Sequence, residues 1–186
     1  MTCIVAVKGN GKIVIGGDSA GVSGLDVCVR KDPKVFRVGD FVIGFTSSFR
    51  MGQALMDLKV PAQKKGEDDY AYMRTTFVKT VQKLFEKAGF LKTEHDQKSG
   101  GTFLVIYRNE IYKIEEDFQV EVRYDPYNAC GCGEGYALGA LAAYSVGNEL
   151  IQRPRASVER ALSIAERFSG GVRAPWTIIE IPHKVT

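Results

Sequence analysis

The second residue, Thr2, has an unusual chemical capability at this position. Once Met1 is removed, the threonine carries a free α-amine beside its own hydroxyl. The reference pKa of an α-amine is about 7.7–8.0, so part of it is unprotonated at neutral pH. The amine can therefore take the hydroxyl proton, directly or through water, and make Thr2 a nucleophile. This chemistry needs no histidine, and the chain has only two, His95 and His183.

Two charged residues follow Thr2 at intervals of sixteen positions. Asp18 ends an apolar, strand-like segment, and Lys34 lies sixteen residues further on. A buried lysine near a hydroxyl favours the alkoxide, and a paired carboxylate would hold that lysine. Taken alone, Asp18 is more readily interpreted as a turn residue and Lys34 as a solvated one. We expect the three residues to form one group if the fold brings them together.

The composition excludes several other classes of protein. A length of 186 residues suits one domain over residues 1–186. Hydrophobic residues make up 45% and charged residues 25%, which excludes disordered and collagen-like chains. The 25 Lys and Arg against 22 Asp and Glu leave a net charge of +3 with no basic run, so we expect no nucleic-acid partner.

The cysteines and the apolar runs indicate the compartment. A chain of this length can build a core without disulfides, so we expect free thiols and a cytoplasmic location. Cys130 and Cys132 lack a second cysteine pair and nearby histidines, so we expect neither a metal site nor a cofactor. No apolar run reaches the roughly 18–20 residues of a transmembrane helix, and the first residues do not resemble a signal peptide.

Hydrophobic patterning predicts strands at the start of the chain and helices after them. An Asn-Gly turn joins expected strands over residues 2–7 and 12–17. Because residues 4–7 leave neither face polar, the first strand should be covered on both sides. Further strands are expected over 34–38 and 41–45, and a helix over 49–60. A second helix, up to Gly89, is indicated by the apolar stripe Tyr70, Met73, Phe77, Val81 and Leu84.

The second half repeats this order of strands followed by helices. The polar stretch 92–101 is interpreted as a surface loop. Strands are expected over 102–107, 110–114, 120–124 and 175–181, and helices over 133–148 and around the periodic apolar residues from Val158 to Phe168. Helices that come in pairs argue against a doubly wound parallel sheet. We therefore predict an α+β fold, a four-layer αββα sandwich of two stacked antiparallel sheets between helix pairs.

Several segments, in order, resemble a known family. Thr2 precedes Ile-Val-Ala-Val, Gly-Gly precedes Asp18, and Lys34 begins Lys-Val-Phe. The stretch around Cys132 is similar to the family's Gly-Ser-Gly turn into a helix, and the stretch from Glu166 to its Asp-x-x-Ser-Gly-Gly segment. The family is the N-terminal nucleophile hydrolases, and the likeness is to proteasome β subunits, most closely the HslV-type peptidase of the bacterial ATP-dependent protease.

The resemblance implies a role for each matching residue and an activity for the chain. Thr2 is the implied nucleophile and its α-amine the base, and the reaction is peptide-bond hydrolysis through an acyl-enzyme on Thr2. The implied assembly is a homo-oligomeric ring, a stacked hexamer or heptamer, that takes peptides or unfolded proteins and can have an ATPase unfoldase as a partner. The other implied site residues are the ion pair of Asp18 and Lys34, the amine-supporting Cys132, Glu166 and Ser169, and a backbone N–H near Ser47 and Ser48 as oxyanion donor.

The sequence departs from the family pattern at three places and leaves other functions open. Cys132 replaces a serine, Glu166 replaces an aspartate, and the oxyanion turn carries serines where relatives often have glycine. If Met1 is retained, the Thr2 nitrogen is an amide without a basic lone pair. A catalytically inactive proteasome-like assembly protein is therefore one alternative. An amidohydrolase for small amides is another, and a cysteine hydrolase based on Cys132 is a weaker one because neither histidine has a suitable spacing.

Overall fold

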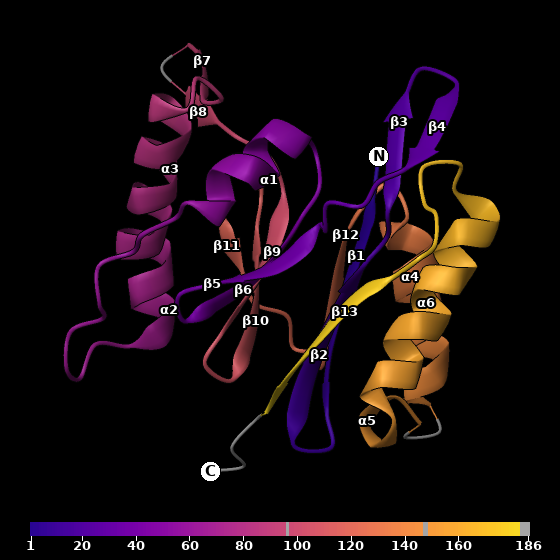
Figure 1. Cartoon of the computed structure of the whole chain (residues 1–186). Coiled ribbons are helices and arrows are strands. Elements are labelled where there is room, and N and C mark those ends of the chain that lie inside the picture. The colour runs from indigo at the N-terminus through magenta and orange to yellow at the C-terminus, as the bar shows by residue number, and fades with distance from the viewer. Residues whose placement is uncertain (96, 147–148, 183–186) are drawn as a thin grey trace.

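Two antiparallel β-sheets face each other at the centre of the molecule, and helices cover the outer face of each sheet (Figure 1). The structure is a computed structural model that describes residues 1–95, 97–146 and 149–182. The four layers confirm the αββα sandwich predicted from the sequence. The end of the helix expected over 133–148 lies outside the described residues.

The first sheet has the strand order β12-β1-β2-β13, with every neighbouring pair antiparallel. The hairpin between β1 and β2 turns at Asn10 and Gly11, which both have positive φ angles of 45° and 66°, as an Asn-Gly turn requires. In this hairpin Ile4 pairs with Gly17, so the start of β1 and the end of β2 lie at the same end of the sheet. The strands are β1 (Cys3–Gly9), β2 (Lys12–Gly17), β12 (Tyr127–Gly131) and β13 (Thr177–Pro182).

The second sheet has the order β11-β10-β9-β6-β5 and is also antiparallel. The strand expected over 120–124 is shorter in the structure, because only two of its residues pair with β10. The strands are β5 (Val35–Val38), β6 (Phe41–Phe45), β9 (Phe103–Tyr107), β10 (Glu110–Ile114) and β11 (Val120–Glu121).

Two small hairpins were not expected from the sequence. The stretch 92–101, interpreted as a loop, contains β7 (Lys92–Glu94) and β8 (Gln97–Ser99). The other hairpin joins β3 (Ala20–Ser23) to β4 (Asp26–Val29) and stands clear of the body beside the N-terminus (Figure 1). The strands of both hairpins have only three or four residues, which is too short for a periodic pattern. Cys28, on β4, is consequently exposed.

The helices over the second sheet are α1 (Phe49–Met56), α2 (Asp69–Tyr72), a π-helical turn η1 (Met73–Phe77) and α3 (Val78–Lys87). Over the first sheet lie α4 (Glu134–Ser145), α5 (Glu149–Gln152) and α6 (Pro154–Phe168). Helix α1 ends four residues before the predicted end, at the cap residue Asp57. Phe168, predicted on a buried face, is 58% exposed and stacks on Tyr136 at the surface. None of the helices in the described ranges is long and apolar enough to span a bilayer.

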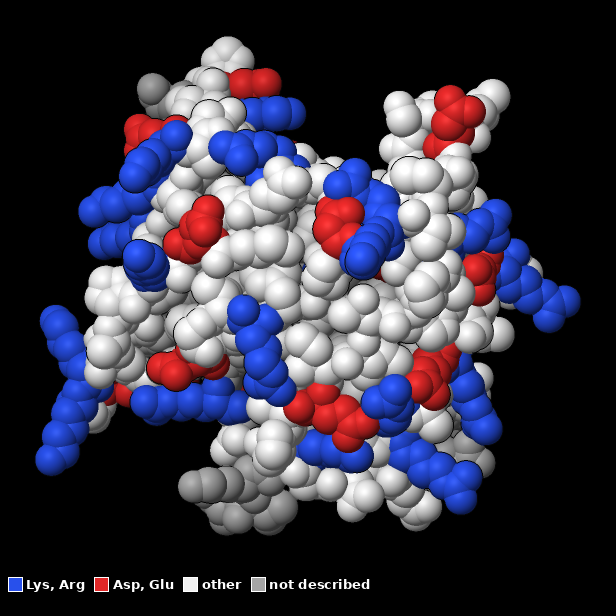
Figure 2. Space-filling model, viewed as in Figure 1, with Lys and Arg blue, Asp and Glu red and all other residues white. Residues whose placement is uncertain are grey.

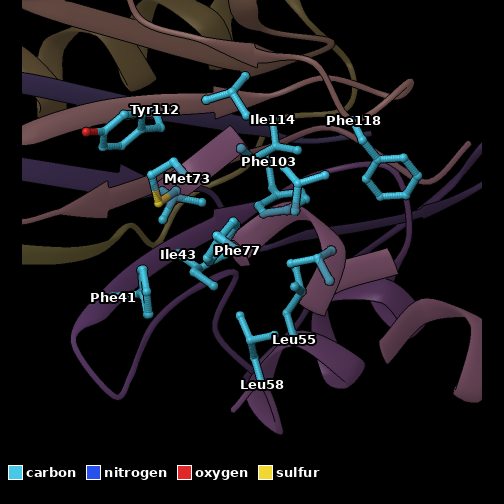
Figure 3. Close-up of a cluster of buried hydrophobic side chains, with 14 of the residues drawn as sticks. Phe41, Ile43, Leu55, Leu58, Met73, Phe77, Phe103, Tyr112, Ile114 and Phe118 are labelled. Atoms are coloured by element: carbon cyan, nitrogen blue, oxygen red, sulfur yellow. The ribbon is translucent and has the colours of Figure 1, made fainter. Parts of the chain in front are cut away.

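Three buried clusters separate the four layers. Alternate residues of strand β1 contribute to two of these clusters. Ile4 and Ala6 belong to the cluster between the sheets, whereas Val5 and Val7 belong to the cluster under α4 and α6. This confirms the prediction that β1 is covered on both sides. The third cluster is rich in aromatic residues and lies between the second sheet and α1 to α3, with Phe41, Phe77 and Phe103 among its members (Figure 3).

Charge is distributed unevenly over the surface. In the view of Figure 2, basic side chains gather over α3, whose exposed face carries Lys79, Lys83 and Lys87. Acidic and basic side chains alternate over the lower part of the same view. The surface ion pairs include Glu180, which bridges Lys12 and Arg155. The small net charge of +3 therefore conceals one locally positive helix.

Candidate active site

Thr2 lies immediately before β1 and is only 4% exposed. Its carbonyl oxygen accepts hydrogen bonds from the Gly133 amide at 3.3 Å and the Cys132 thiol at 3.4 Å. Gly131 has a φ of +102°, and a side chain there would collide with the same carbonyl oxygen. The turn between β12 and α4 is thus folded closely around the Thr2 backbone.

Asp18 and Lys34 form a buried ion pair beside Thr2. Asp18 follows β2, Lys34 precedes β5, and their side chains are 0% and 1% exposed with Nζ and Oδ1 2.9 Å apart. The carboxylate also accepts three backbone N–H groups, at 2.9, 2.8 and 3.3 Å, which satisfies both oxygens. These donors are the amides of Cys3, Ala20 and Arg173. The predicted pair therefore exists, and the backbone on both sides of it fixes its position.

The Lys34 ammonium and the Thr2 hydroxyl converge on one atom, the carbonyl oxygen of Met1. Lys34 Nζ donates to this oxygen at 3.4 Å, and Thr2 Oγ1 donates to it as well. Burial lowers the pKa of Lys34, and the negative charge and hydrogen bond of Asp18 oppose this effect. The arrangement places a positive charge next to the hydroxyl that the sequence indicates as nucleophile.

The Thr2 nitrogen contacts a thiol, and this thiol in turn contacts a hydroxyl. The nitrogen donates to Cys132 Sγ at 3.2 Å, and Cys132 Sγ is 3.3 Å from Ser169 Oγ. Ser169 is the C-cap residue of α6. Removal of Met1 would turn this nitrogen from an amide into an amine. Cys132 therefore contacts the Thr2 nitrogen directly, and Ser169 contacts Cys132.

Glu166, unlike the other acidic candidate Asp18, lies on a helix and contacts the segment that follows it. It lies in the last turn of α6 and accepts a hydrogen bond from the Ala174 amide at 3.0 Å. Within the described ranges it makes no hydrogen bond to Thr2, Cys132 or Ser169. Its direct contact instead anchors the segment that follows α6, from which the Arg173 amide reaches Asp18.

The two oxyanion candidates differ in what their N–H groups already bind. The Ser48 amide donates to the Thr46 carbonyl at 2.6 Å, and its hydroxyl caps α1 by accepting from the Arg50 amide. Ser47 has a φ of +58°, and its hydroxyl accepts from the Thr102 amide at 3.1 Å, which supports this left-handed conformation. Within the described part of the chain, the Ser47 N–H has no protein acceptor. Ser47 is therefore the better donor for a developing oxyanion.

A small cavity of about 80 Å³ adjoins Thr2 and the 46–48 turn. Its apolar walls are Val22, Phe45 and Phe49, and Met1 closes part of it. Larger cavities of about 690 and 490 Å³ lie elsewhere and contain none of the site residues. Among the residues that the structure describes, no group of three or more His, Cys, Asp or Glu side chains is arranged to hold a metal ion.

Sequence reasoning missed the backbone donors to Asp18 and the apolar walls of this cavity. A backbone N–H carries no residue-type signal, so the contacts from Ala20 and Arg173 could be found only in the structure. Strand β12, which leads into the Cys132 turn, was missed because its sequence Tyr-Asn-Ala-Cys-Gly alternates weakly. The sequence hinted at this cavity only through Phe45 and Phe49, two aromatic residues on either side of the 46–48 turn.

Comparison with known proteins gives a match in structure. No family model matches the sequence, and no curated protein matches it. The structure of Thiobacillus denitrificans BPH superposes with a TM-score of 0.77 at 20% identity, covering 99% of this chain and 100% of that chain. Its complex with epoxomicin gives the same TM-score and identity over 97% of this chain and 98% of that one.

Two further solved structures are similar over most of their length. Eukaryotic HslV from Trypanosoma brucei has a TM-score of 0.67 at 19% identity, covering 97% of this chain and 99% of that chain. The Gly-1 mutant of Anbu from Hyphomicrobium sp. strain MC1 has a TM-score of 0.71 at 15% identity, covering 98% and 82%. The chain thus has the N-terminal nucleophile hydrolase fold of HslV-like, proteasome-type proteins.

Proposed function

We propose that the chain is an N-terminal threonine peptidase of the proteasome type, active after Met1 is removed. The observation that carries this proposal is the convergence of the Lys34 ammonium and the Thr2 hydroxyl on the Met1 carbonyl oxygen. A buried lysine beside a hydroxyl that follows the first residue has little structural purpose, since burying a charge is costly. It has a clear chemical purpose if the hydroxyl must lose its proton.

Each group would have a defined part in the reaction. The Thr2 hydroxyl oxygen adds to the substrate carbonyl carbon while the new α-amine takes its proton. The Ser47 N–H stabilises the oxyanion, and Lys34 stabilises the developing negative charge on the hydroxyl. The amine then passes the proton to the leaving nitrogen, which leaves an ester on Thr2. Water hydrolyses this ester with the amine again as base, and the enzyme returns to its starting state.

The substrate class we propose is a peptide or an unfolded protein. Its side chain next to the cleaved bond would enter the apolar cavity formed by Val22, Phe45 and Phe49. The small volume of about 80 Å³, part of it bordered by Met1, implies that processing also enlarges the space for the substrate. Folded proteins would need an ATPase unfoldase before cleavage, and a cytoplasmic location suits such a partner.

The processed N-terminus is the direct test of this proposal. Intact-mass analysis of the purified chain should show loss of Met1, and epoxomicin should add once to Thr2, because an epoxyketone reacts with both the hydroxyl and the free amine. A fluorogenic peptide should be cleaved at the same time. A processed chain that neither forms the adduct nor cleaves peptides would contradict the proposal.

A second function, that of an inactive proteasome-like assembly protein, is favoured by the position of Met1. The Met1 side chain packs over Gly171, where any added side chain would collide with Met1 and with Cys132. The Met1 carbonyl oxygen has two donors. The backbone of a retained Met1 is therefore held at the site, although the residue is 57% exposed. A chain whose measured mass includes Met1 would support this second function.

We also propose assembly into a homo-oligomeric ring, partly through the exposed face of α4. This helix is apolar on all sides, but only Ala137 and Leu141 are buried in the single chain. Two glycines of this helix, Gly135 and Gly139, border open space, since a Cβ added at either would meet no atom within 4 Å. Small residues on an exposed apolar helix allow another subunit to approach closely.

Gly139→Arg should therefore impair assembly without harming the fold. Arginine has a helix propensity better than glycine by roughly 0.8–1 kcal/mol, and the site is open in the single chain, so the subunit itself should be slightly stabilised. Native mass measurement should show a shift from the ring to smaller species. Gln53→Arg, on the exposed side of α1, is the matched control. Equal masses for both variants and the unmodified chain would exclude this face from the contact.

A further inference from the structure

Lys113 is a nearly buried charge in the second sheet that the proposed reaction does not use. It lies on β10 and is 7% exposed. Its Nζ is 2.9 Å from Glu134 Oε1 and 3.0 Å from Glu115 Oε1. Burial alone would lower the pKa of Lys113, but its hydrogen bonds to Glu134 and Glu115 outweigh burial and raise it. The side chain therefore remains a charged ammonium that binds both carboxylates.

The contact with Glu134 connects two distant layers of the sandwich. Lys113 belongs to the second sheet, whereas Glu134 is the first residue of α4, on the outer face of the first sheet. Strand β10 contacts β12, the strand that leads into α4. The ion pair therefore connects the second sheet to α4 near the point where β10 and β12 meet. It attaches the first turn of α4 to a rigid strand of the other sheet.

The segment between β12 and α4 is the one that holds the Thr2 backbone. It consists of Cys132 and Gly133, which follow Gly131 at the end of β12, and Gly133 is an N-cap residue without a capping side chain. On its N-terminal side the segment is held by pairing of Gly131 with Cys3. On its C-terminal side the described ion pair of Glu134 is the side-chain anchor, two residues from the Cys132 thiol. The two flanking glycines give this backbone more conformational freedom than other residues would. The Glu134 anchor therefore adds to the hydrogen bonds that Gly133 and Cys132 make with the Thr2 carbonyl oxygen.

We propose that Lys113 is a positioning residue, which through Glu134 holds the Cys132 turn at the correct distance from the Thr2 nitrogen. This inference rests on the proposed function, because it concerns the same site. Cys132 Sγ is 3.2 Å from that nitrogen, a distance that a small shift of the turn would alter. Misplacement of a catalytic group by about 1 Å can cost up to 10²-fold in rate.

The main test is Lys113→Met in the processed chain, with Glu134→Gln as a second variant that keeps more of the local packing. We expect kcat to fall by about tenfold with little change in KM, because substrate contacts are unaffected. The acidic limb of the pH–rate profile, which reports the Thr2 amine, should shift. Lys12→Met, on β2, removes a more exposed ion pair, with Glu180 at 2.7 Å, and should change neither quantity.

A readout that does not depend on peptidase activity is the alkylation rate of Cys132 by iodoacetamide, followed by peptide mass mapping. Loss of the anchor should loosen the contacts of the thiol with Thr2 and Ser169 and raise this rate severalfold in the folded protein. If the unmodified chain lacks peptidase activity but the alkylation rate rises in Lys113→Met, the proposed function fails and the positioning role stands.

Other outcomes would overturn the inference. An unchanged alkylation rate and pH profile in both variants would show that the ion pair does not control the turn. A loss of kcat that only follows the folded fraction, measured by thermal unfolding, would show a purely structural role. The same change in Lys12→Met would show a general effect of removing an ion pair.

Discussion

Thr2→Ala is expected to lower peptide hydrolysis by at least about 10³-fold, to the level of the uncatalysed background, whereas Thr2→Ser retains measurable turnover. Alanine removes the hydroxyl that would form the acyl-enzyme but leaves the α-amine, Lys34 and Asp18 in place. Serine restores the hydroxyl at the same carbon. Turnover of a fluorogenic peptide by the three processed chains is the measurement.

The two variants can be compared directly with the unmodified chain, because alanine and serine are both smaller than threonine. Met1 should be removed from each variant, as intact mass would verify, and neither residue adds volume to the buried position of Thr2. The free energy of unfolding should change little, since the hydroxyl's partner is the Met1 carbonyl, which processing removes. Undiminished cleavage by Thr2→Ala would place the catalytic nucleophile elsewhere or identify the activity as a contaminant.

Asp18→Ala is expected to lower the free energy of unfolding by about 3–5 kcal/mol, and Lys34→Met by clearly less. Alanine at position 18 leaves a buried ammonium and three backbone N–H groups without their acceptor. Methionine at position 34 fills the space of the lysine stem, and the Asp18 carboxylate keeps its three N–H donors. Urea unfolding of the two variants measures the difference.

The lowered pKa of Lys34 adds a pH dependence with a definite sign. Between that lowered value and the ordinary value of about 10.5, the unfolded chain binds more protons at this position than the folded chain. The Lys34 contribution to the free energy of unfolding therefore rises with pH in this window. The difference in stability between the unmodified chain and Lys34→Met should shift in favour of the unmodified chain as the pH is raised.

Two results would contradict this account of the ion pair. Equal losses of stability in Asp18→Ala and Lys34→Met would mean that the backbone donors to Asp18 contribute nothing measurable. A pH-independent difference between the unmodified chain and Lys34→Met would mean that Lys34 titrates alike in the folded and unfolded states. Thr46→Val, a nearby substitution without a charge, serves as the comparison for the pH series.

Local patterns predicted most of the fold because the strands that matter are strongly apolar. The bounds of β2, β6 and β10 agree with the prediction, and β1 was expected to be covered on both faces. A strand of that kind requires a layer on each side, which leads to the four-layer sandwich. The two hairpins were missed because their strands have only three or four residues. Strand β12 was missed because its sequence alternates weakly, although four of its five residues are buried.

The prediction of site residues was uneven for a related reason. Thr2, Asp18 and Lys34 each lie at the end of a strand, and antiparallel pairing of β1 with β2 brings two of them together. Ser47 and Ser48 were equivalent in the sequence, and only the hydrogen bond from the Ser48 amide to Thr46 separates their roles. Glu166 was matched by its spacing to Ser169, but spacing does not reveal that its carboxylate binds the Ala174 amide.

From the residues alone one could infer the layers and the chemical capability of an N-terminal threonine, because hydrophobic periodicity and side-chain chemistry are local properties. The position of each group around Thr2 depends on contacts between residues far apart in the chain. Cys132 reaches the Thr2 nitrogen across 130 residues, and Arg173 reaches Asp18 across 155. Such contacts follow from the packing of whole sheets and helices, so the arrangement of the site could be read only from the folded molecule.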